Sequence, residues 1–411
     1  MTAFTKFARR ITIVLFVTQS LVSAGNIASA TVNPIVGAQL GGSDYWTGVP
    51  TAVYLLGAAF AASAWGYIMD AIGRRNGILL GLFAGVIGNA MIVLAIRAEA
   101  MLTLLAGMVL VGATNAAVAL ARFAAGEVNP PEQRGGAISL VVWGGTFGAV
   151  FGPLLVGPTG VFAKGFGFNE LAGPYLAALV LLAAVSVIVF AGLRPDPREL
   201  GKQIAELHPS AAPAGQSRSM REIFRQPAAL TAVSAMALGQ VVMAAIMVIT
   251  SRHMNQRQHG LTDIAHVIQA HTIGMYAFSV ISGRLSDKWG REPVILAGAT
   301  ILLLACATAP LSPDVLPLAA SLFFLGLGWN LCFVGGSALL SDQLSPLERS
   351  RTQGTNDLMV GLASAAGSLG SGIVFAASSY TVISLAAGLI SLIPLLMALA
   401  WTRKKPARVP A

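Results

Sequence analysis

The sequence predicts an all-α membrane protein, with twelve transmembrane helices arranged in two six-helix halves. Hydrophobic residues make up 55% of the 411 residues, charged residues only 10%, and the mean hydropathy is +0.73. Soluble domains carry about 25% charged residues. The apolar residues gather in runs of about 20, the length at which a helix crosses the hydrocarbon core of a bilayer. We therefore expect the lipid bilayer to surround most of the chain.

Twelve apolar runs follow one another along the chain. They fall near residues 11–33, 46–69, 77–96, 101–126, 136–158, 171–193, 228–250, 263–285, 293–310, 315–341, 352–377 and 381–401. The first run follows three basic residues, as in a secretory signal peptide, but it is longer than the apolar core of such a peptide. We interpret it as the first membrane helix.

A long polar stretch separates the sixth run from the seventh. It contains Ala211-Ala212-Pro213-Ala214-Gly215 and six basic residues, a composition typical of a linker. The sequence thus predicts an N-terminal six-helix half (1–193), a cytoplasmic linker (194–227) and a C-terminal six-helix half (228–411).

Lysine and arginine are distributed unevenly between the two sides of the expected membrane. The termini and the connections after even-numbered helices hold 20 of them, whereas the opposite connections hold 4. The positive-inside rule then places both termini in the cytoplasm of a multi-pass inner-membrane protein. The net charge of +9 is explained by these loops, so it does not indicate binding to nucleic acid.

Four residues recur at a constant shift of 217 positions, which indicates an internal repeat. The first copy is Gly66, Asp70, Gly73 and Arg74, and the second is Gly283, Asp287, Gly290 and Arg291. Both copies follow an even-numbered helix on the cytoplasmic side. An aspartate there can face a helix N-terminus and pair with the arginine, so we interpret the motif as a conformational latch.

Two pairs of soft metal ligands lie on consecutive apolar runs. Met243 and Met247 belong to the seventh helix, and His271 and Met275 to the eighth. A spacing of four places each pair on one helix face. Thioether sulfur and imidazole nitrogen together suit Cu(I). Methionine is also an ordinary gap-filler in helix packing, but an ionisable residue inside a membrane helix is a functional candidate by default.

The two pairs are expected at a similar depth in the membrane. Met243 and His271 each lie seven or eight residues from the same surface, roughly 11–12 Å at 1.5 Å per residue. If the two helices are antiparallel neighbours, these two side chains are the principal ligands. Met247 and Met275 would then pass the ion in and out.

Four other residues are candidates for supporting roles. Gln240 and Tyr276 lie next to the two pairs and can donate or accept hydrogen bonds around bound metal. Asp357, about one turn into the eleventh helix, can take up a proton. Arg122, near the cytoplasmic end of the fourth helix, is expected to pair with Glu127 or a carbonyl, or to act in conformational coupling.

The two pairs, their order and their helices resemble those of the CcoA-like copper importers, a bacterial branch of the major facilitator superfamily. The segments Arg122-Phe123-Ala124-Ala125 and His271 to Ala277 are similar to that branch, and Gly-x-x-x-Asp-x-x-Gly-Arg-Arg resembles the loop signature of the superfamily.

The resemblance implies the major facilitator fold, alternating access and copper import that supplies the maturation of cytochrome oxidase. It implies that Met243, Met247, His271 and Met275 handle the copper ion, which is a substrate and not a cofactor. A copper chaperone is a further candidate partner. Cys306 and Cys332 lie in other helices, so we expect no thiol ligand.

Two alternatives remain open. One is a proton-coupled exporter or importer of a small organic molecule, which the glycine stripe from Gly144 to Pro153 mildly favours and the lack of a carboxylate in the first helix disfavours. The other is a metal sensor that does not transport, against which the duplicated latch argues. The chain carries no nucleotide-binding loop or other enzyme motif, so we expect a secondary transporter, not an enzyme, that acts as a monomer.

Overall fold

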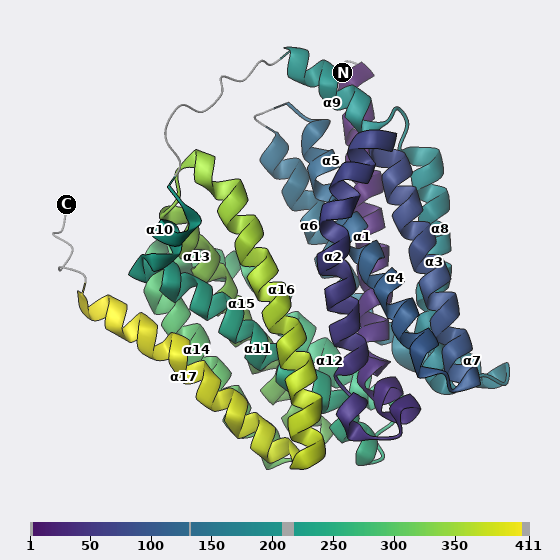
Figure 1. The fold of residues 1–411 in the computed structure, drawn as a ribbon, viewed down its shortest axis with the longest axis vertical. Helices are drawn as coiled ribbons and strands as arrows, with labels where there is room; N and C mark the ends of the chain where they lie inside the picture. The colour runs from purple at the N-terminus through teal and green to yellow at the C-terminus, as the bar shows by residue number, and fades with distance from the viewer. Residues whose placement is uncertain (1–2, 131–132, 208–217, 405–411) are drawn as a thin grey trace. The chain divides into compact units, whose positions relative to one another are not determined.

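The computed structural model describes residues 3–130, 133–207 and 218–404, and it is helical without strands over these ranges (Figure 1). In this part of the chain, 11 helices are long and apolar enough to cross a membrane. The number is up to 12 when the segments Asp44–Ala62 and Ala64–Ile72, which meet at 47°, count as one span. The all-α membrane fold expected from the twelve apolar runs is confirmed.

The chain divides into two compact units, residues 1–212 with 258–269, and residues 213–257 with 270–411. The helices of the first unit are α1 (Ala3–Gly41), α2 (Val49–Ile72), α3 (Arg74–Ala98), α4 (Met101–Ala119), α5 (Ala121–Glu127), α6 (Arg134–Phe151), α7 (Val156–Gly165), α8 (Gly173–Gly192) and α9 (Pro197–Leu207). Helices α4 and α5 form one span, and α6 and α7 form another. Helix α1 continues beyond its expected end and stops where Gly42 adopts a φ of +66°, a common way to end a helix.

The remaining helices are α10 (Met220–Arg225), α11 (Pro227–Gln256), α12 (Leu261–Tyr276), α13 (Ser279–Trp289), α14 (Arg291–Thr308), α15 (Val315–Asp342), α16 (Pro346–Ala377) and α17 (Tyr380–Lys404). Helices α12 and α13 form a single span interrupted after Tyr276. The first part of α12 groups with the N-terminal unit. Polar residues at its start make α16 longer than its apolar run, because the helix begins at Pro346.

The two units repeat the same helix contacts, visible within each unit in Figure 1. In the first unit, α1 packs against α6 and α8, and α3 packs against α4 and α8. In the second unit, α11 packs against α16 and α17, and α14 packs against α15 and α17. The corresponding spans are the first, third, fourth, fifth and sixth of each half. This agreement supports the internal repeat found in the sequence.

The described parts of the polar segment 194–227 contain two helices, α9 and α10. Leu200 and Ile204 on one face of α9 are buried in the core of the first unit. Ser219 and Glu222 form a capping box at the start of α10. The Ala211 to Gly215 stretch on which the linker interpretation rested lies outside the described residues.

The second glycine of each repeat copy occupies a backbone conformation that other residues avoid. Gly73, between α2 and α3, has φ +91° and ψ 162°, and Gly290, between α13 and α14, has φ +99° and ψ 165°. This region of φ and ψ is essentially restricted to glycine. The chain reverses direction at these two positions, and only glycine adopts the backbone angles that each reversal uses. By contrast, a Cβ at Gly66 or Gly283 meets nothing within 4 Å.

We predict that Gly290→Ala destabilises the protein by about 1–3 kcal/mol, because alanine is strained at this φ and ψ. Gly283→Ala is the matched control, since it lies within α13 where alanine has space and a better helix propensity. Thermal unfolding of the purified chain in detergent should show a lower midpoint for Gly290→Ala only. Equal midpoints for both variants would contradict the backbone argument.

Candidate functional site

Met243 and Met247 share a face of α11 with Gln240, whose side chain is hydrogen-bonded to two other helices. Met243 is buried and Met247 is half-buried, and Gln240 lies on the same face at helical spacings of three and seven. The Gln240 Nε2 atom donates to Ser364 Oγ of α16 at 2.9 Å, and its Oε1 accepts from Trp329 Nε1 of α15 at 2.7 Å. Gln240, which was expected beside the methionines, is therefore held through both its amide nitrogen and its amide oxygen.

His271 is completely buried and only one of its ring nitrogens has a partner. The Nδ1 atom lies 3.0 Å from the carbonyl oxygen of Leu322 in α15, whereas Nε2 has no hydrogen-bond partner. Because a carbonyl oxygen only accepts, this contact assigns the hydrogen to Nδ1 and leaves a lone pair on Nε2. Metal-binding histidines are oriented in this way, with the second nitrogen donating to a carbonyl or carboxylate.

Helix α12 approaches α15 at the level of their backbones. A Cβ at Gly274 would collide with the carbonyl oxygen of Phe323, and a Cβ at Gly326 would collide with that of His271. Small residues at such a crossing allow close helix packing in membranes. This close approach brings His271 within reach of the Leu322 carbonyl. Met275, one turn further along α12, is buried beside the same crossing.

The break between α12 and α13 lies directly after the expected ligands and is held by Asn330 of α15. The Asn330 Nδ2 atom donates to Met275 O at 2.6 Å and to Ser279 Oγ at 2.9 Å, and its Oδ1 accepts from Ser282 Oγ at 2.5 Å. Interrupted helices with satisfied polar groups are typical of transporter binding sites. Asn330 was missed in the sequence, although a polar amide within an apolar run is a usable signal.

Trp329 of α15 contacts one residue beside each pair, Gln240 of α11 and Tyr276 of α12. Its indole donates to Gln240 of α11, and its ring lies 6.4 Å from the Tyr276 ring of α12, edge to face. The expectation that the pairs face each other across two neighbouring helices stays a prediction. The described contacts show instead that α11 and α12 each pack against α15.

The described residues contain no group of three or more His, Cys, Asp or Glu side chains that could hold a metal ion. A metal at His271 would therefore depend on thioether sulfur. Cys306 and Cys332 are both buried and free, and the Cys332 thiol faces the Ile295 carbonyl at 3.8 Å. His271 and Met275 remain the predicted ligands on α12, with Met243 and Met247 predicted on α11.

The two residues suggested for coupling lie differently from what the sequence indicated. The Arg122 guanidinium stacks over Phe123 at 4.9 Å, and Glu127 pairs with Arg74, so the expected Arg122–Glu127 pair is wrong. Asp357 was expected about one turn into its helix. It lies about three turns after Pro346, because α16 begins earlier than its apolar run, and it is exposed.

The arginine of each repeat copy bridges two acidic residues of its own unit. Arg74 contacts Asp70 at 2.6 Å and holds Glu127 with two bonds of 2.8 and 3.0 Å. Arg291 contacts Asp287 at 2.7 Å and Asp342 at 3.0 Å. In both units this connects the end of the second span to the end of the fourth. The role of these residues as a latch stays a prediction.

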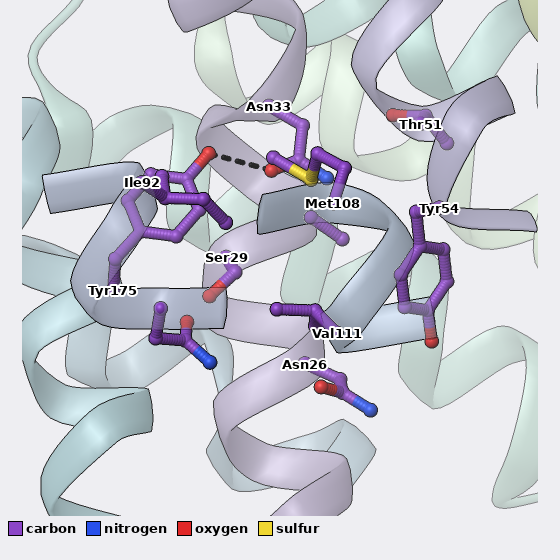
Figure 2. A pocket seen from close by; sticks show the side chains of 11 residues that line it. Asn26, Ser29, Asn33, Thr51, Tyr54, Ile92, Met108, Val111 and Tyr175 are labelled. Carbon is purple, nitrogen blue, oxygen red and sulfur yellow. Dashed lines mark hydrogen bonds between the residues drawn. The ribbon is translucent and has the colours of Figure 1, made fainter. Parts of the chain in front are cut away.

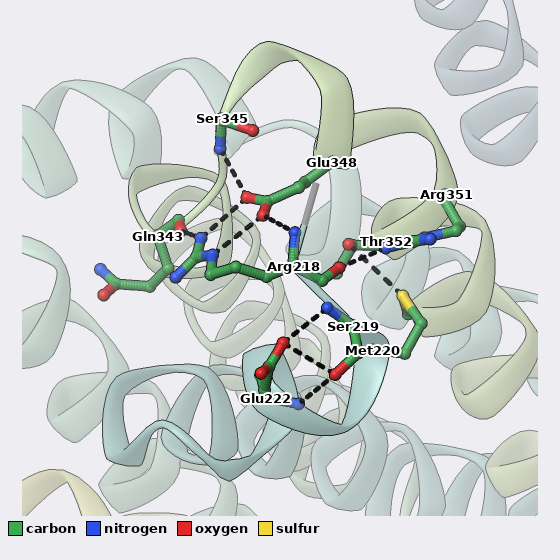
Figure 3. Close-up of polar contacts among 9 residues, drawn as sticks. All are labelled: Arg218, Ser219, Met220, Glu222, Gln343, Ser345, Glu348, Arg351 and Thr352. Atoms are coloured by element: carbon green, nitrogen blue, oxygen red, sulfur yellow. Dashed lines mark hydrogen bonds and ion pairs between the residues drawn. The ribbon is translucent and has the colours of Figure 1, made fainter. Parts of the chain in front are cut away.

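A second ionic cluster, absent from the sequence predictions, connects the segment before α10 to the start of α16 (Figure 3). Glu348 is almost completely buried and accepts from Arg218 through Nε and the backbone N–H, both at 2.9 Å, and Nη2 at 2.8 Å. Arg218 also donates to Gln343 O at 2.6 Å. The Arg218 guanidinium holds the pKa of the Glu348 carboxyl well below its usual range.

A sequence profile of the Major Facilitator Superfamily matches residues 15–270 and 243–411, which together cover nearly the whole chain. The chain belongs to the Major Facilitator Superfamily. The match explains the duplicated contacts and the recurring loop motif, since superfamily transporters consist of two related six-helix halves.

Curated members of the superfamily resemble the chain over most of its length. The uncharacterized transporter YdeG of Bacillus subtilis (strain 168) is 33% identical to this chain, and the match covers 96% of this chain and 92% of YdeG. The uncharacterized transporter YddS of the same organism is 35% identical, and the match covers 92% of this chain and 88% of YddS. The riboflavin transporter RfnT of Brucella anthropi is 27% identical over 86% of each protein.

Solved structures show the same fold at low sequence identity. A bacterial homologue of the human lysosomal transporter Spinster has a TM-score of 0.71 at 15% identity and covers 98% of this chain and 99% of its own. The nucleoside transporter NupG has a TM-score of 0.69 at 14% identity and covers 97% of this chain and 100% of its own. Together with the profile, these similarities identify a secondary transporter with many membrane spans.

We predict that the stability contributed by the Arg218–Glu348 pair is lost at acid pH. The pKa of Glu348 is lowered in the folded protein, so the ionised carboxylate stabilises the fold above its unfolded pKa of about 4.3. This contribution disappears as the pH falls through the lower folded value. The unfolding midpoint of Glu348→Gln should therefore lie below that of the wild type at pH 7, and the two should converge as the pH decreases below about 4.

The matched control for this prediction is Glu199→Gln, which breaks an exposed pair with Lys202 and should change the midpoint little at any pH. The difference between the unfolding midpoints of the wild type and Glu348→Gln could instead stay constant from pH 7 to acid pH. This result would show that the carboxylate charge does not stabilise the cluster.

Proposed function

We propose that this transporter carries copper, as Cu(I), into the bacterial cytoplasm by alternating access. The observation that carries the proposal is the buried Nε2 atom of His271, which has no partner while Nδ1 is held by the Leu322 carbonyl. A buried acceptor without a donor is costly unless a ligand or water occupies it. A metal ion is the ligand that this tautomer and orientation suit best.

The neighbouring side chains favour a soft, singly charged ion. Met275 shares the helix face of His271, and Met243 and Met247 share a face of α11 that also meets α15 through Gln240. Thioether and neutral imidazole select Cu(I) over hard cations. All four ligands are uncharged, so the bound ion keeps its single charge without a carboxylate or thiolate. Such a site releases its ion more easily than a thiolate site, as transport requires.

Inward transport and a role in supplying cytochrome oxidase rest on the resemblance to the CcoA-like importers. Two related halves that rock about a site near the membrane midplane provide the route. In this proposal, the Asp70–Arg74 and Asp287–Arg291 pairs act as the cytoplasmic latch, both termini are cytoplasmic, and the chain acts as a monomer. A cytoplasmic copper chaperone is the expected receiver of the ion.

A second candidate is a polar organic substrate. RfnT, named for riboflavin transport, is 27% identical over 86% of this chain, which supports an organic substrate for the present protein as well. Under this alternative the paired Trp329 and Tyr276 rings would supply an aromatic surface, and His271 Nε2 would accept a hydrogen bond from the substrate.

We predict that cells expressing the wild-type chain take up radioactive copper, and that His271→Gln and Met243→Leu reduce this uptake about tenfold or more at limiting copper, because each removes one of few ligands. Both changes are close in size to the native side chain, so packing is nearly kept. Met254→Leu is the matched control, since Met254 is a buried methionine of α11 beyond the pair. Membrane levels of every variant should be measured by immunoblot.

Riboflavin uptake by the same strains separates the two candidates. Copper uptake that both site variants lose and Met254→Leu retains would support the metal site. Riboflavin uptake without copper uptake would replace the copper proposal by the organic one. Copper uptake unaffected by His271→Gln would contradict the assigned ligands.

A further inference from the structure

Two concave sites in the N-terminal unit differ in their chemistry. The first is an internal cavity of about 50 Å³ between α1, α2, α3, α4 and α8, where Ile92, Met108 and Val111 lie beside neutral amides and hydroxyls (Figure 2). The second is a groove of about 410 Å³ at the start of α1. The groove is lined by Lys6, Arg9, Arg10, Ile13 and Val14. Of the two sites, the groove is therefore the one whose chemistry suits an ionic ligand.

The groove forms where the start of α1 packs against the end of α8. A Cβ at Gly192, the last residue of α8, would lie 2.6 Å from Val14 Cγ2, so the two helices approach closely beside the groove. The Arg10 Nη2 atom donates to the carbonyl oxygen of Arg194, just after α8. These contacts hold the lining helix against a second element and orient the Arg10 side chain.

The cations of the groove have no acidic partner in the described part of the chain. None of the ion pairs there includes Lys6, Arg9 or Arg10. Asp196, the first carboxylate after α8 in the sequence, accepts from two backbone N–H groups at the start of α3 at 3.1 and 3.0 Å. The groove therefore keeps an excess of positive charge, which favours an anionic ligand.

Further cationic and aromatic side chains surround the end of α8. The guanidinium groups of Arg75 and Arg194 lie 4.7 and 5.1 Å from the centre of the Phe190 ring, and that of Arg10 lies 5.4 Å from the Phe7 ring. Both rings are partly or fully exposed, and the apolar run of α1 begins directly after Arg10. Aromatic and basic side chains at the end of an apolar run are typical of a membrane–water interface.

The position and the lining of the groove together define an amphiphilic anion as its ligand. Lys6, Arg9 and Arg10 precede the apolar run, whereas Ile13 and Val14 belong to it, so the groove lies where lipid headgroups meet hydrocarbon. Ammonium and guanidinium groups bind phosphate oxygens, and arginine can do so with two parallel hydrogen bonds. The lining contains no carboxylate, so it offers no partner to the ammonium group of a zwitterionic headgroup.

We propose that this groove binds the phosphate group of an anionic phospholipid from the surrounding membrane. Its volume of about 410 Å³ falls within the range of about 300–1,000 Å³ that is usual for small-molecule sites. Lysine and arginine clusters beside a membrane helix attract anionic lipids. A lipid held by Arg10 strengthens the junction of α1 and α8, which Arg10 already bridges. The groove contains none of the residues assigned to copper, so this inference is independent of the proposed function.

The test uses the purified full-length chain in a neutral detergent, without copper or an organic substrate. Native mass spectrometry measures the binding of dioleoylphosphatidylglycerol and of dioleoylphosphatidylethanolamine, with inorganic phosphate as a competitor in a parallel series. We expect the wild type to bind one phosphatidylglycerol about tenfold more tightly than phosphatidylethanolamine. Arg9→Gln should weaken this binding about fivefold, and Arg9→Gln combined with Arg10→Gln about 25-fold, because each cation near an anionic surface changes the affinity about fivefold.

Lys164→Gln is the matched control, because it removes one positive charge from an exposed position in α7, at the other end of the N-terminal unit (Figure 1). It should bind phosphatidylglycerol as the wild type does. Arg9→Lys keeps the charge and should keep most of the binding. Arg9 is exposed and has no ion pair among the described residues, so Arg9→Gln remains a folded variant if the combined variant fails to fold.

Three results would overturn the proposal. They are equal binding of the two lipids, undiminished binding of phosphatidylglycerol in both arginine variants, and displacement of phosphatidylglycerol by an equal concentration of inorganic phosphate. The last result would assign the groove to free phosphate and not to a lipid.

Discussion

The main constraint on this structure is that a polar group inside a bilayer must find its partner within the protein. Helices satisfy the backbone, so the buried side-chain amides, hydroxyls and imidazole are the groups that need explanation. Gln240 and Asn330 are fully engaged by neighbouring helices and hold α11, α12, α15 and α16 together. His271 Nε2 and Asn89 Oδ1 are not engaged. A buried group without a partner is one where a ligand or an ordered water can be sought.

Backbone contact between α12 and α15 is what makes the environment of His271 possible. Only glycine at positions 274 and 326 allows the two helices to approach so closely. The Leu322 carbonyl then reaches Nδ1 and selects the tautomer, and Asn330 can satisfy the carbonyl of Met275 at the break that follows. A larger residue at the crossing would separate the helices and remove both contacts. The ligand geometry therefore depends on residues that have no metal-binding chemistry of their own.

The spans and the repeat could be predicted because they follow from local properties, namely the length of apolar runs and glycines that a sharp reversal requires. Gly73 and Gly290 recur in the sequence because their φ and ψ exclude other residues. Contacts between distant segments could not be predicted. Arg218 and Glu348 are 130 positions apart in the sequence. Glu127 pairs with Arg74, although Arg122 is closer to it in the sequence. The position of Asp357 within its helix differs from the expected one because α16 begins several residues before its apolar run.

The repeat also shows where the two halves have diverged. The Asp–Arg pairs and the glycines with positive φ are the same in both, as expected for parts that serve the common fold. The unpaired buried groups are not the same. Among the described residues of the N-terminal unit they are the oxygens of Ser29, Thr47, Thr51 and Asn89 and the Nε atom of Arg75, whereas the C-terminal unit has an imidazole nitrogen, His271 Nε2, besides three oxygens. No imidazole stands among the unpaired groups described in the N-terminal unit, so the chemistry on which the copper proposal rests belongs to one half and is not part of the shared repeat.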